Sequence, residues 1–352
     1  TLMRIDLLVG ENQYDSTLYF SKKLSEALER QGVNTRLFWV ADGNFHEAAR
    51  AIMHEPPDLT CSFSDITVGD NQPIGDQWQI PHLSMLLDPA IYSLHQLKGE
   101  YSLISCVDEE DVAFVKELGF ERAFFLPHGV DHDLSGYEER SYEAVFFGSC
   151  FDYEKINASW SPKIRPLLEQ AAERVLSPEG ISTLRALLEA GVEKGLPTYH
   201  HEVDLYVRAK DRVELVRAFS STPVHIWGSG PWKRLCPNAI VHRSIPFEKT
   251  IEKMKRAKLL LNSAPRFKHG SHERILYGLA CGCSVLTGES SFITNHFHDE
   301  PSLYTYRYGH WQEISPKYSE RKVNLNHHSW DQRAKTLITF VKNFFETNHA
   351  LV

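Results

Sequence analysis

The sequence has no apolar run long enough to cross a membrane as a helix. A bilayer span needs about 20 consecutive apolar residues, and no stretch of the 352-residue chain reaches that length. No signal peptide precedes the first predicted strand, which starts at Met3. We therefore expect a cytoplasmic protein without a transmembrane segment.

Cysteine is scarce, and patterns typical of metal sites are missing. The six cysteines form no CxxC pair, and several lie in apolar strand or helix patterns, which is typical of reduced, buried thiols. The 18 histidines are spread without the spacing of metal ligands. The acidic run Asp108–Asp111 is better explained as the first turn of a helix than as a metal-binding pair in a loop. We therefore expect no metal and no other cofactor.

An excess of positive charge is also missing. The net charge of −8 argues against a dedicated nucleic-acid binder, which usually carries a basic stripe. The 42% hydrophobic and 24% charged residues are those of a globular protein with a hydrated surface. Because 352 residues exceed the usual size of a single core, we expect two domains.

What is present is an alternation of strands and helices. In the first half, buried-strand patterns at Met3–Val9 and Asn34–Val40 enclose a helix with apolar positions from Leu18 to Leu28. Similar units continue to Leu126 and predict a doubly wound, parallel, Rossmann-like α/β domain. The GxGxxG fingerprint of dinucleotide-binding domains is absent.

The second half repeats this alternation after a strand at Ala144–Phe147. Residues 152–219 interrupt it with helical patterns, and their number predicts a helical insertion with a layer of its own. We predict a first domain at 1–136 and a second Rossmann-like domain at 137–328. A C-terminal helix in 329–352, with Ser329 as its N-cap, would pack back on the first domain.

One stretch, 262–287 (NSAPRFKHGSHERILYGLACGCSVLT), predicts a strand end, a polar loop, a helix from Glu273 and a new strand. The N-terminus of such a helix suits an anion, phosphate above all. Glu273 is suited to accept hydrogen bonds from sugar hydroxyls, or alternatively caps the helix. The loop adds two cations and two small residues that permit close approach, namely Arg266, Lys268, Gly270 and Ser271.

A series of short motifs resembles a known family. The motifs are IPHLSMLLDP, LPHGVD, AVFFGS, HIWGSGPW, IPFEKTIEKMKRAKLLLN, GSHERILYGLACGCSVLT and SWDQRAKTLITFV. In this order they resemble glycosyltransferases of the two-Rossmann-domain GT-B architecture, particularly the CgeB-like group. More distantly, the chain is similar to the retaining group 1 enzymes with a Glu–seven residues–Glu motif. The resemblance covers most of the chain except residues 152–218.

The sequence departs from that motif at both glutamates. His269 and Tyr277 stand at the two positions, whereas Arg274 matches an arginine of the CgeB-like pattern. The family implies transfer with retention of configuration, which we expect here, and inversion remains the alternative.

The resemblance implies that the second domain binds a nucleotide-sugar donor and the first domain the acceptor. The implied donor-binding residues are Gly148, Ser149, Gly228, Gly230, Arg266, Lys268, His269, Gly270, Ser271, Glu273 and Arg274. In the first domain, the loop of Gly10, Glu11 and Asn12 follows the first strand and would approach the sugar and acceptor.

The catalytic candidates are Asp88, His128 and Glu273. Asp88 follows a predicted strand and is placed to act as a general base if the enzyme inverts. Alternatively, Asp88 only starts a turn with Pro89, and His128 only packs at the crossing between the domains.

These observations predict a metal-independent glycosyltransferase that moves a sugar from a nucleotide-activated donor to an unidentified acceptor. The acceptor could be a glycan, a protein or a small molecule. One alternative is a non-catalytic protein that binds nucleotides or sugars. Another is a glycosyltransferase that modifies nucleic acid, which the acidic balance disfavours.

Overall fold

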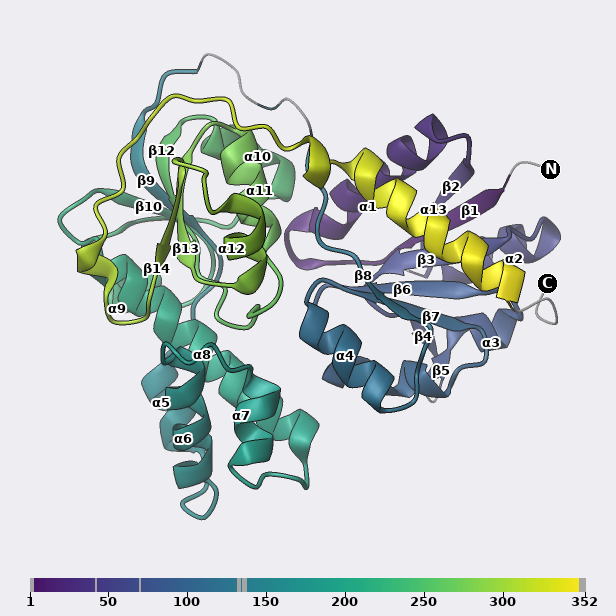
Figure 1. The fold of residues 1–352 in the computed structure, drawn as a ribbon, viewed down its shortest axis with the longest axis horizontal. Coiled ribbons are helices and arrows are strands. Elements are labelled where there is room, and N and C mark those ends of the chain that lie inside the picture. The colour runs from purple at the N-terminus through teal and green to yellow at the C-terminus, as the bar shows by residue number, and fades with distance from the viewer. Residues whose placement is uncertain (1–2, 42, 70, 132–133, 135–137, 348–352) are drawn as a thin grey trace. The chain divides into compact units, whose positions relative to one another are not determined.

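The computed structural model describes residues 3–41, 43–69, 71–131, 134 and 138–347. The chain folds into two units: unit 1 contains residues 1–131 and 325–352, and unit 2 contains residues 132–324. Each unit is built on a six-stranded parallel sheet flanked by helices (Figure 1). The sequence had placed the boundaries at 136/137 and 328/329. The predicted fold class, two Rossmann-like units, is confirmed.

Unit 1 has the strand order β2-β1-β3-β6-β7-β8. Chain order reverses between β1 and β3, so the topological switch point lies there. The strands are β1 (Arg4–Val9), β2 (Asn34–Trp39), β3 (Leu59–Phe63), β6 (His82–Leu86), β7 (Ser102–Cys106) and β8 (Ala123–Phe125). The α-helices are α1 (Ser16–Arg30), α2 (Phe45–His54), α3 (Ile74–Trp78), α4 (Glu109–Glu117) and α13 (Trp330–Thr347). A short antiparallel pair, β4 (Thr67–Val68) and β5 (Gln72–Pro73), precedes α3.

The C-terminal helix α13 belongs to unit 1, where it packs along α1 (Figure 1). The Ser329 hydroxyl accepts a hydrogen bond from the Gln332 N–H at 3.3 Å, so it caps the helix as predicted. The backbone N–H of Val130 donates to the His328 carbonyl at 3.0 Å. The second contact joins the residues just before α13 to the segment that follows β8.

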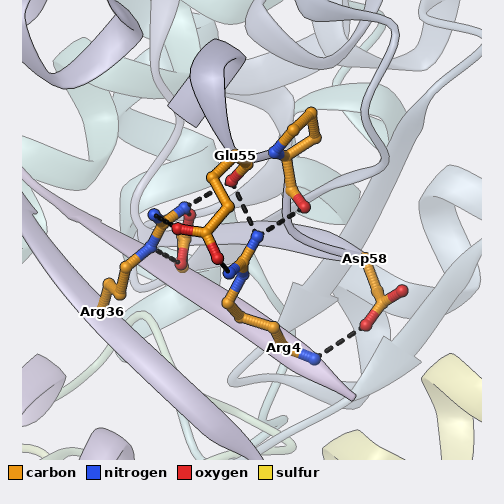
Figure 2. Close-up of polar contacts among 6 residues, drawn as sticks. Arg4, Arg36, Glu55 and Asp58 are labelled. Atoms are coloured by element: carbon orange, nitrogen blue, oxygen red, sulfur yellow. Dashed lines mark hydrogen bonds and ion pairs between the residues drawn. The ribbon is translucent and has the colours of Figure 1, made fainter. Parts of the chain in front are cut away.

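Charged side chains join the amino ends of β1 and β2. Asp6 is fully buried on β1, and Arg36 on β2 donates to its two oxygens at 2.9 and 2.5 Å. The Arg36 guanidinium also contacts Glu55, which bonds Arg4, and the Arg4 backbone donates to Asp58 (Figure 2). Because Asp6 has a bidentate cationic partner, its burial leaves no uncompensated charge.

His82 on β6 is buried and neutral. Its ring nitrogens lie 2.9 Å from the Thr60 hydroxyl and 3.1 Å from the Ser62 hydroxyl, both on the neighbouring β3. Burial lowers the pKa of His82 to about 3. The side chain therefore stays uncharged near neutral pH.

Unit 2 has the strand order β11-β10-β9-β12-β13-β14. Its switch point lies between β9 and β12. The strands are β9 (Tyr142–Phe147), β10 (Val224–Trp227), β11 (Ile240–His242), β12 (Ala257–Leu261), β13 (Ser284–Gly288) and β14 (Leu303–Tyr306). Beyond the insertion, the helices are α9 (Trp232–Leu235), α10 (Phe247–Met254), α11 (Glu273–Ala280) and α12 (Ser291–Phe297).

The predicted helical insertion is present after β9. Its helices are α5 (Tyr153–Ser159), α6 (Arg165–Leu176), α7 (Thr183–Glu189) and α8 (Leu196–Ala218). α5, α6 and α7 pack on α8 around a small core of their own (Figure 1). The C-terminal half of α8 also contributes apolar residues such as Val213 to the core of the sheet. One helix therefore joins the insertion to the Rossmann-like unit.

All six cysteines lie in the described part of the chain, and each is buried and outside any disulfide, as expected. Among the described residues, no helix combines the length and the apolar character needed to span a bilayer.

Candidate functional site

The loops at the switch point of unit 2 contain most of the predicted donor-binding residues. Gly148 and Ser149 follow β9, and the loop that begins at Asn262 follows β12 and leads to α11. Neighbouring parallel strands that send their connections in opposite directions leave a crevice beyond their carboxyl ends, and ligands bind there. The topology therefore places these two loops at the same edge of the sheet.

The glycines at this edge allow two loops to touch backbone to backbone. The Gly148 N–H donates to the Trp227 carbonyl at 3.0 Å. A Cβ atom on Gly228 would lie 1.9 Å from the Gly148 carbonyl oxygen, and one on Gly230 would lie 2.1 Å from the Cys150 carbonyl oxygen. Contact between the loops therefore requires both glycines. The predicted approach of Gly228 and Gly230 to the nucleotide base remains a prediction.

Helix α8 brings four charged side chains to this edge, and the sequence analysis named none of them. They are Asp204, Arg208, Asp211 and Arg212. Their spacing of four, seven and eight residues places them on one face of the helix. The spacing of apolar residues predicted this helix. Nothing in the sequence indicated that its charged face contacts the loop after β12.

Arg212 is the most unusual of these side chains. It is 7% exposed and donates to the Ser149 carbonyl at 2.7 Å. Burial and three neighbouring arginines, Arg208, Arg274 and Arg266, together lower its pKa to about 9, and Asp204 only partly offsets them. Within the described residues, Arg212 forms no ion pair. It is thus a buried cation in a positive environment.

Arg266, predicted to neutralise a diphosphate, is bonded to Asp204. Its Nε lies 3.1 Å from Asp204 Oδ1 and its Nη2 lies 2.5 Å from Oδ2. Arg208 donates to the same Oδ2 at 2.9 Å. Burial alone would raise the pKa of Asp204, but Arg266 and Arg208 outweigh it and hold that pKa well below its usual range. Asp204 is therefore an ionised carboxylate between two arginines.

Lys268 and Asp211 line a second part of the edge. Lys268 donates to the Val175 carbonyl of the insertion at 2.8 Å. Asp211 accepts hydrogen bonds from the Ser263 hydroxyl at 2.5 Å and the Tyr306 hydroxyl at 2.7 Å, and burial raises its pKa. Both residues line a pocket between the insertion and the ends of β12, β13 and β14.

The start of α11 is formed by His272 and Glu273. His272 Nδ1 lies 2.7 Å from Glu273 Oε2 and 3.4 Å from the Arg274 N–H nitrogen, so the histidine ring sits at the N-cap. Glu273 is 9% exposed. Gly270 and Ser271 are buried, and the Ser271 hydroxyl has no hydrogen-bond partner among the described residues.

The residues at the two positions of the Glu–seven residues–Glu motif, Tyr277 and His269, are both engaged in contacts within unit 2. Tyr277 is fully buried and packs edge-on against Phe247, with ring centroids 5.1 Å apart. His269 Nδ1 lies 3.0 Å from the Ser291 hydroxyl at the start of α12. Glu273 is therefore the carboxylate that this chain offers at the N-terminus of α11.

In unit 1, the predicted loop of Gly10, Glu11 and Asn12 follows β1 at the switch point of that sheet. Glu11 is exposed, and Asn12 Oδ1 accepts a hydrogen bond from the Ser16 hydroxyl at 2.8 Å. Three residues in the loops after β1 and β3 adopt positive φ angles, namely Tyr14 (69°), Asp15 (53°) and Ser64 (70°). Backbone strain of this kind concentrates at binding and catalytic sites.

The other two catalytic candidates also lie in unit 1. Asp88 is exposed just after the end of β6, as predicted. His128 is buried, its ring lies edge-on to Phe20 at 5.7 Å, and its carbonyl accepts a hydrogen bond from Arg333 at 2.9 Å. These contacts agree with the packing alternative for His128, and its catalytic role remains a prediction.

Among the described residues, no three His, Cys, Asp or Glu side chains gather as metal ligands. The acidic run behaves as predicted: Asp108 caps α4, with its carboxylate 2.9 Å from the Glu110 N–H nitrogen.

Part of the chain matches a known protein family, and its fold matches solved structures. Residues 208–339 match the family described as glycosyl transferase-like. The solved structure of AviGT4, a glycosyltransferase involved in avilamycin A biosynthesis, is 10% identical, with 98% of both chains covered and a TM-score of 0.56. The matched segment runs from α8 to α13 and includes the loop after β12. Residues 208–339 are therefore similar to a glycosyltransferase domain, and the chain has the GT-B fold, as the motifs predicted.

Other similar structures have TM-scores below 0.5. Sucrose-phosphate synthase from Thermosynechococcus elongatus is 10% identical over 99% of both chains, with a TM-score of 0.48. T4 phage BGT, in complex with UDP and Mn2+, is 14% identical over 99% of this chain and 94% of its own, with a TM-score of 0.47. No curated protein matches the sequence.

Proposed function

We propose that this protein is a glycosyltransferase that uses a nucleotide-activated sugar and holds the donor diphosphate at the switch point of unit 2. The observation that carries the proposal is Arg212, a buried cation that forms no ion pair within the described residues. A buried charge without an opposite charge is strongly unfavourable. A diphosphate beside Arg212 would supply the missing negative charge.

Two further features support an anion at this place. Arg208, Arg266 and Arg274 are close enough to Arg212 to lower its pKa. The α11 N-terminus lies at the same edge of the sheet and favours negative charge. Asp204 is bonded to both Arg208 and Arg266, so one carboxylate is shared by two of these arginines.

The chemistry follows from where charge develops during transfer. As the bond between the sugar and the diphosphate breaks, the leaving nucleoside diphosphate gains negative charge. Guanidinium groups already fixed in place stabilise that charge more in the transition state than in the bound donor. On this proposal the arginines perform the task that a metal ion performs elsewhere, so transfer proceeds without a metal.

Glu273 is proposed to hold the ribose hydroxyls or the transferred sugar, because it is the carboxylate at the start of α11. Retention of configuration is proposed on the family resemblance, and Asp88 becomes the candidate base if the product proves inverted. The net charge of −8 favours an acceptor other than nucleic acid.

A ligand panel tests the proposal. Thermal unfolding is measured with nucleoside diphosphates and nucleotide sugars, each with EDTA and with added Mg²⁺ or Mn²⁺. A nucleoside diphosphate at about 100 times its Kd should stabilise the protein by about 2.7 kcal/mol. The stabilisation should persist in EDTA and vanish in Arg212→Met. Absence of stabilisation by every nucleotide would refute donor binding, and binding only with metal would refute metal independence.

A further inference from the structure

Asp204 occupies the position of an anion within the arginine cluster. Its side chain is 1% exposed, and its two oxygens accept three hydrogen bonds, two from Arg266 and one from Arg208. The Nε and Nη2 groups of a guanidinium form a fork that fits two oxygens of a carboxylate or of a phosphate equally well. Asp204 thus makes the contacts that a phosphate group would make.

A second buried aspartate, in unit 1, offers a comparison with Asp204. Asp6 in unit 1 is equally buried and has the same bidentate contact with Arg36. There the arginine also contacts a second carboxylate, Glu55, which in turn bonds Arg4. Around Asp204, two arginines share one carboxylate, and both lie near Arg212, a third cation.

The location of Asp204 links it to the donor. Asp204 and Arg208 come from α8 of the insertion, whereas Arg266 comes from the loop after β12. A carboxylate in this place neutralises two of the arginines when the site is empty. It also repels a diphosphate bound among them, since like charges a few ångströms apart interact strongly away from bulk water.

We propose that Asp204 is the resident counter-ion of the donor site, which holds Arg208 and Arg266 in the empty site and weakens the binding of the diphosphate. This inference rests on the proposed function. Its consequence for turnover is that the nucleoside diphosphate leaves faster after sugar transfer. A residue with this task tunes product release and takes no part in the chemical step.

The test uses Asp204→Asn, which removes the charge and preserves the shape. Binding of inorganic pyrophosphate and of a nucleoside diphosphate is measured by calorimetry at several salt concentrations. The variant should bind pyrophosphate on the order of tenfold more tightly than the wild type, with a steeper dependence on salt. In steady-state assays KM for the donor and kcat should both fall, as expected when product release becomes slower. Asp6→Asn is the matched control and should leave pyrophosphate affinity unchanged.

Equal or weaker pyrophosphate binding by Asp204→Asn would show that Asp204 only positions the arginines, and would overturn the proposal. If the variant folds only with pyrophosphate present, its Tm should rise more steeply with pyrophosphate than that of the wild type. Failure to fold even then also overturns it, because the anion would not replace the carboxylate. Wild-type protein that binds pyrophosphate but no nucleotide would refute the proposed function and leave the test of Asp204 valid.

Discussion

Replacing Arg212 with methionine should make the empty protein more stable and abolish donor binding. The pKa of Arg212 is lowered from 12.5 to about 9, and the difference at about 1.4 kcal/mol per pH unit is about 5 kcal/mol. Because the pKa of this base is lowered on folding, its charge opposes folding, and fully so at every pH below 9. The lost hydrogen bond to the Ser149 carbonyl offsets about 2–3 kcal/mol. A net stabilisation of about 2 kcal/mol remains.

The matched control is Arg140→Met, also in unit 2. Arg140 donates to the carbonyls of Met254 and Ala257 at 3.1 Å each and of Cys281 at 2.8 Å, and so joins three segments. Its loss should destabilise the protein by about 2–3 kcal/mol without changing pyrophosphate affinity.

Urea denaturation of the empty protein and pyrophosphate calorimetry distinguish the two roles. A gain in stability with loss of binding identifies a residue that is kept for its ligand at the expense of the fold. If Arg212→Met is instead destabilised like the control and binds pyrophosphate normally, the reasoning about a buried cation is wrong.

Three further predictions concern other parts of the chain. Gly228→Ala should destabilise unit 2 by about 1–3 kcal/mol, because its methyl group would collide with the Gly148 carbonyl; an unchanged Tm would contradict this. Lowering the pH from 7.5 to 5 should remove about 2 kcal/mol of stability through His82, whose folded pKa of about 3 lies below its unfolded value of 6.5; a His82→Phe variant should lack this part of the decline. Glu273→Ala and Arg274→Ala should each reduce turnover about 100-fold with the fold intact, and wild-type rates in both would remove them from the site.

The strands were predictable because their residues are buried on both faces. Runs such as Ala144–Phe147 and Lys258–Leu261 are almost continuously apolar, and helices on both sides of a parallel sheet require that pattern. β14 was not predicted, since Leu303–Tyr306 is short and only half-buried. The helical insertion was predictable from its length and the period of its leucines and valines.

The site was only partly predictable. The loop after β12 was predicted because its charges and glycine precede a helix. The ion-pair partner of Arg266 was not predicted. This partner, Asp204, lies 62 residues earlier, on a helix whose polar face has no distinguishing pattern. The positive φ angles of Tyr14 and Ser64 are also invisible in the sequence, because residues of these types rarely adopt them.

Helix α8 has a consequence for how the protein can be divided. Its apolar side chains belong to the core of the sheet, and its arginines lie at the edge where we propose that the donor binds. Deleting the insertion to obtain a minimal enzyme would therefore remove part of the hydrophobic core together with the anion site. Grafting α8 alone onto a relative would transfer Arg208 and Arg212 without Arg266, the loop residue that shares Asp204 with Arg208. The insertion and the Rossmann-like unit have to be exchanged together in any chimaera.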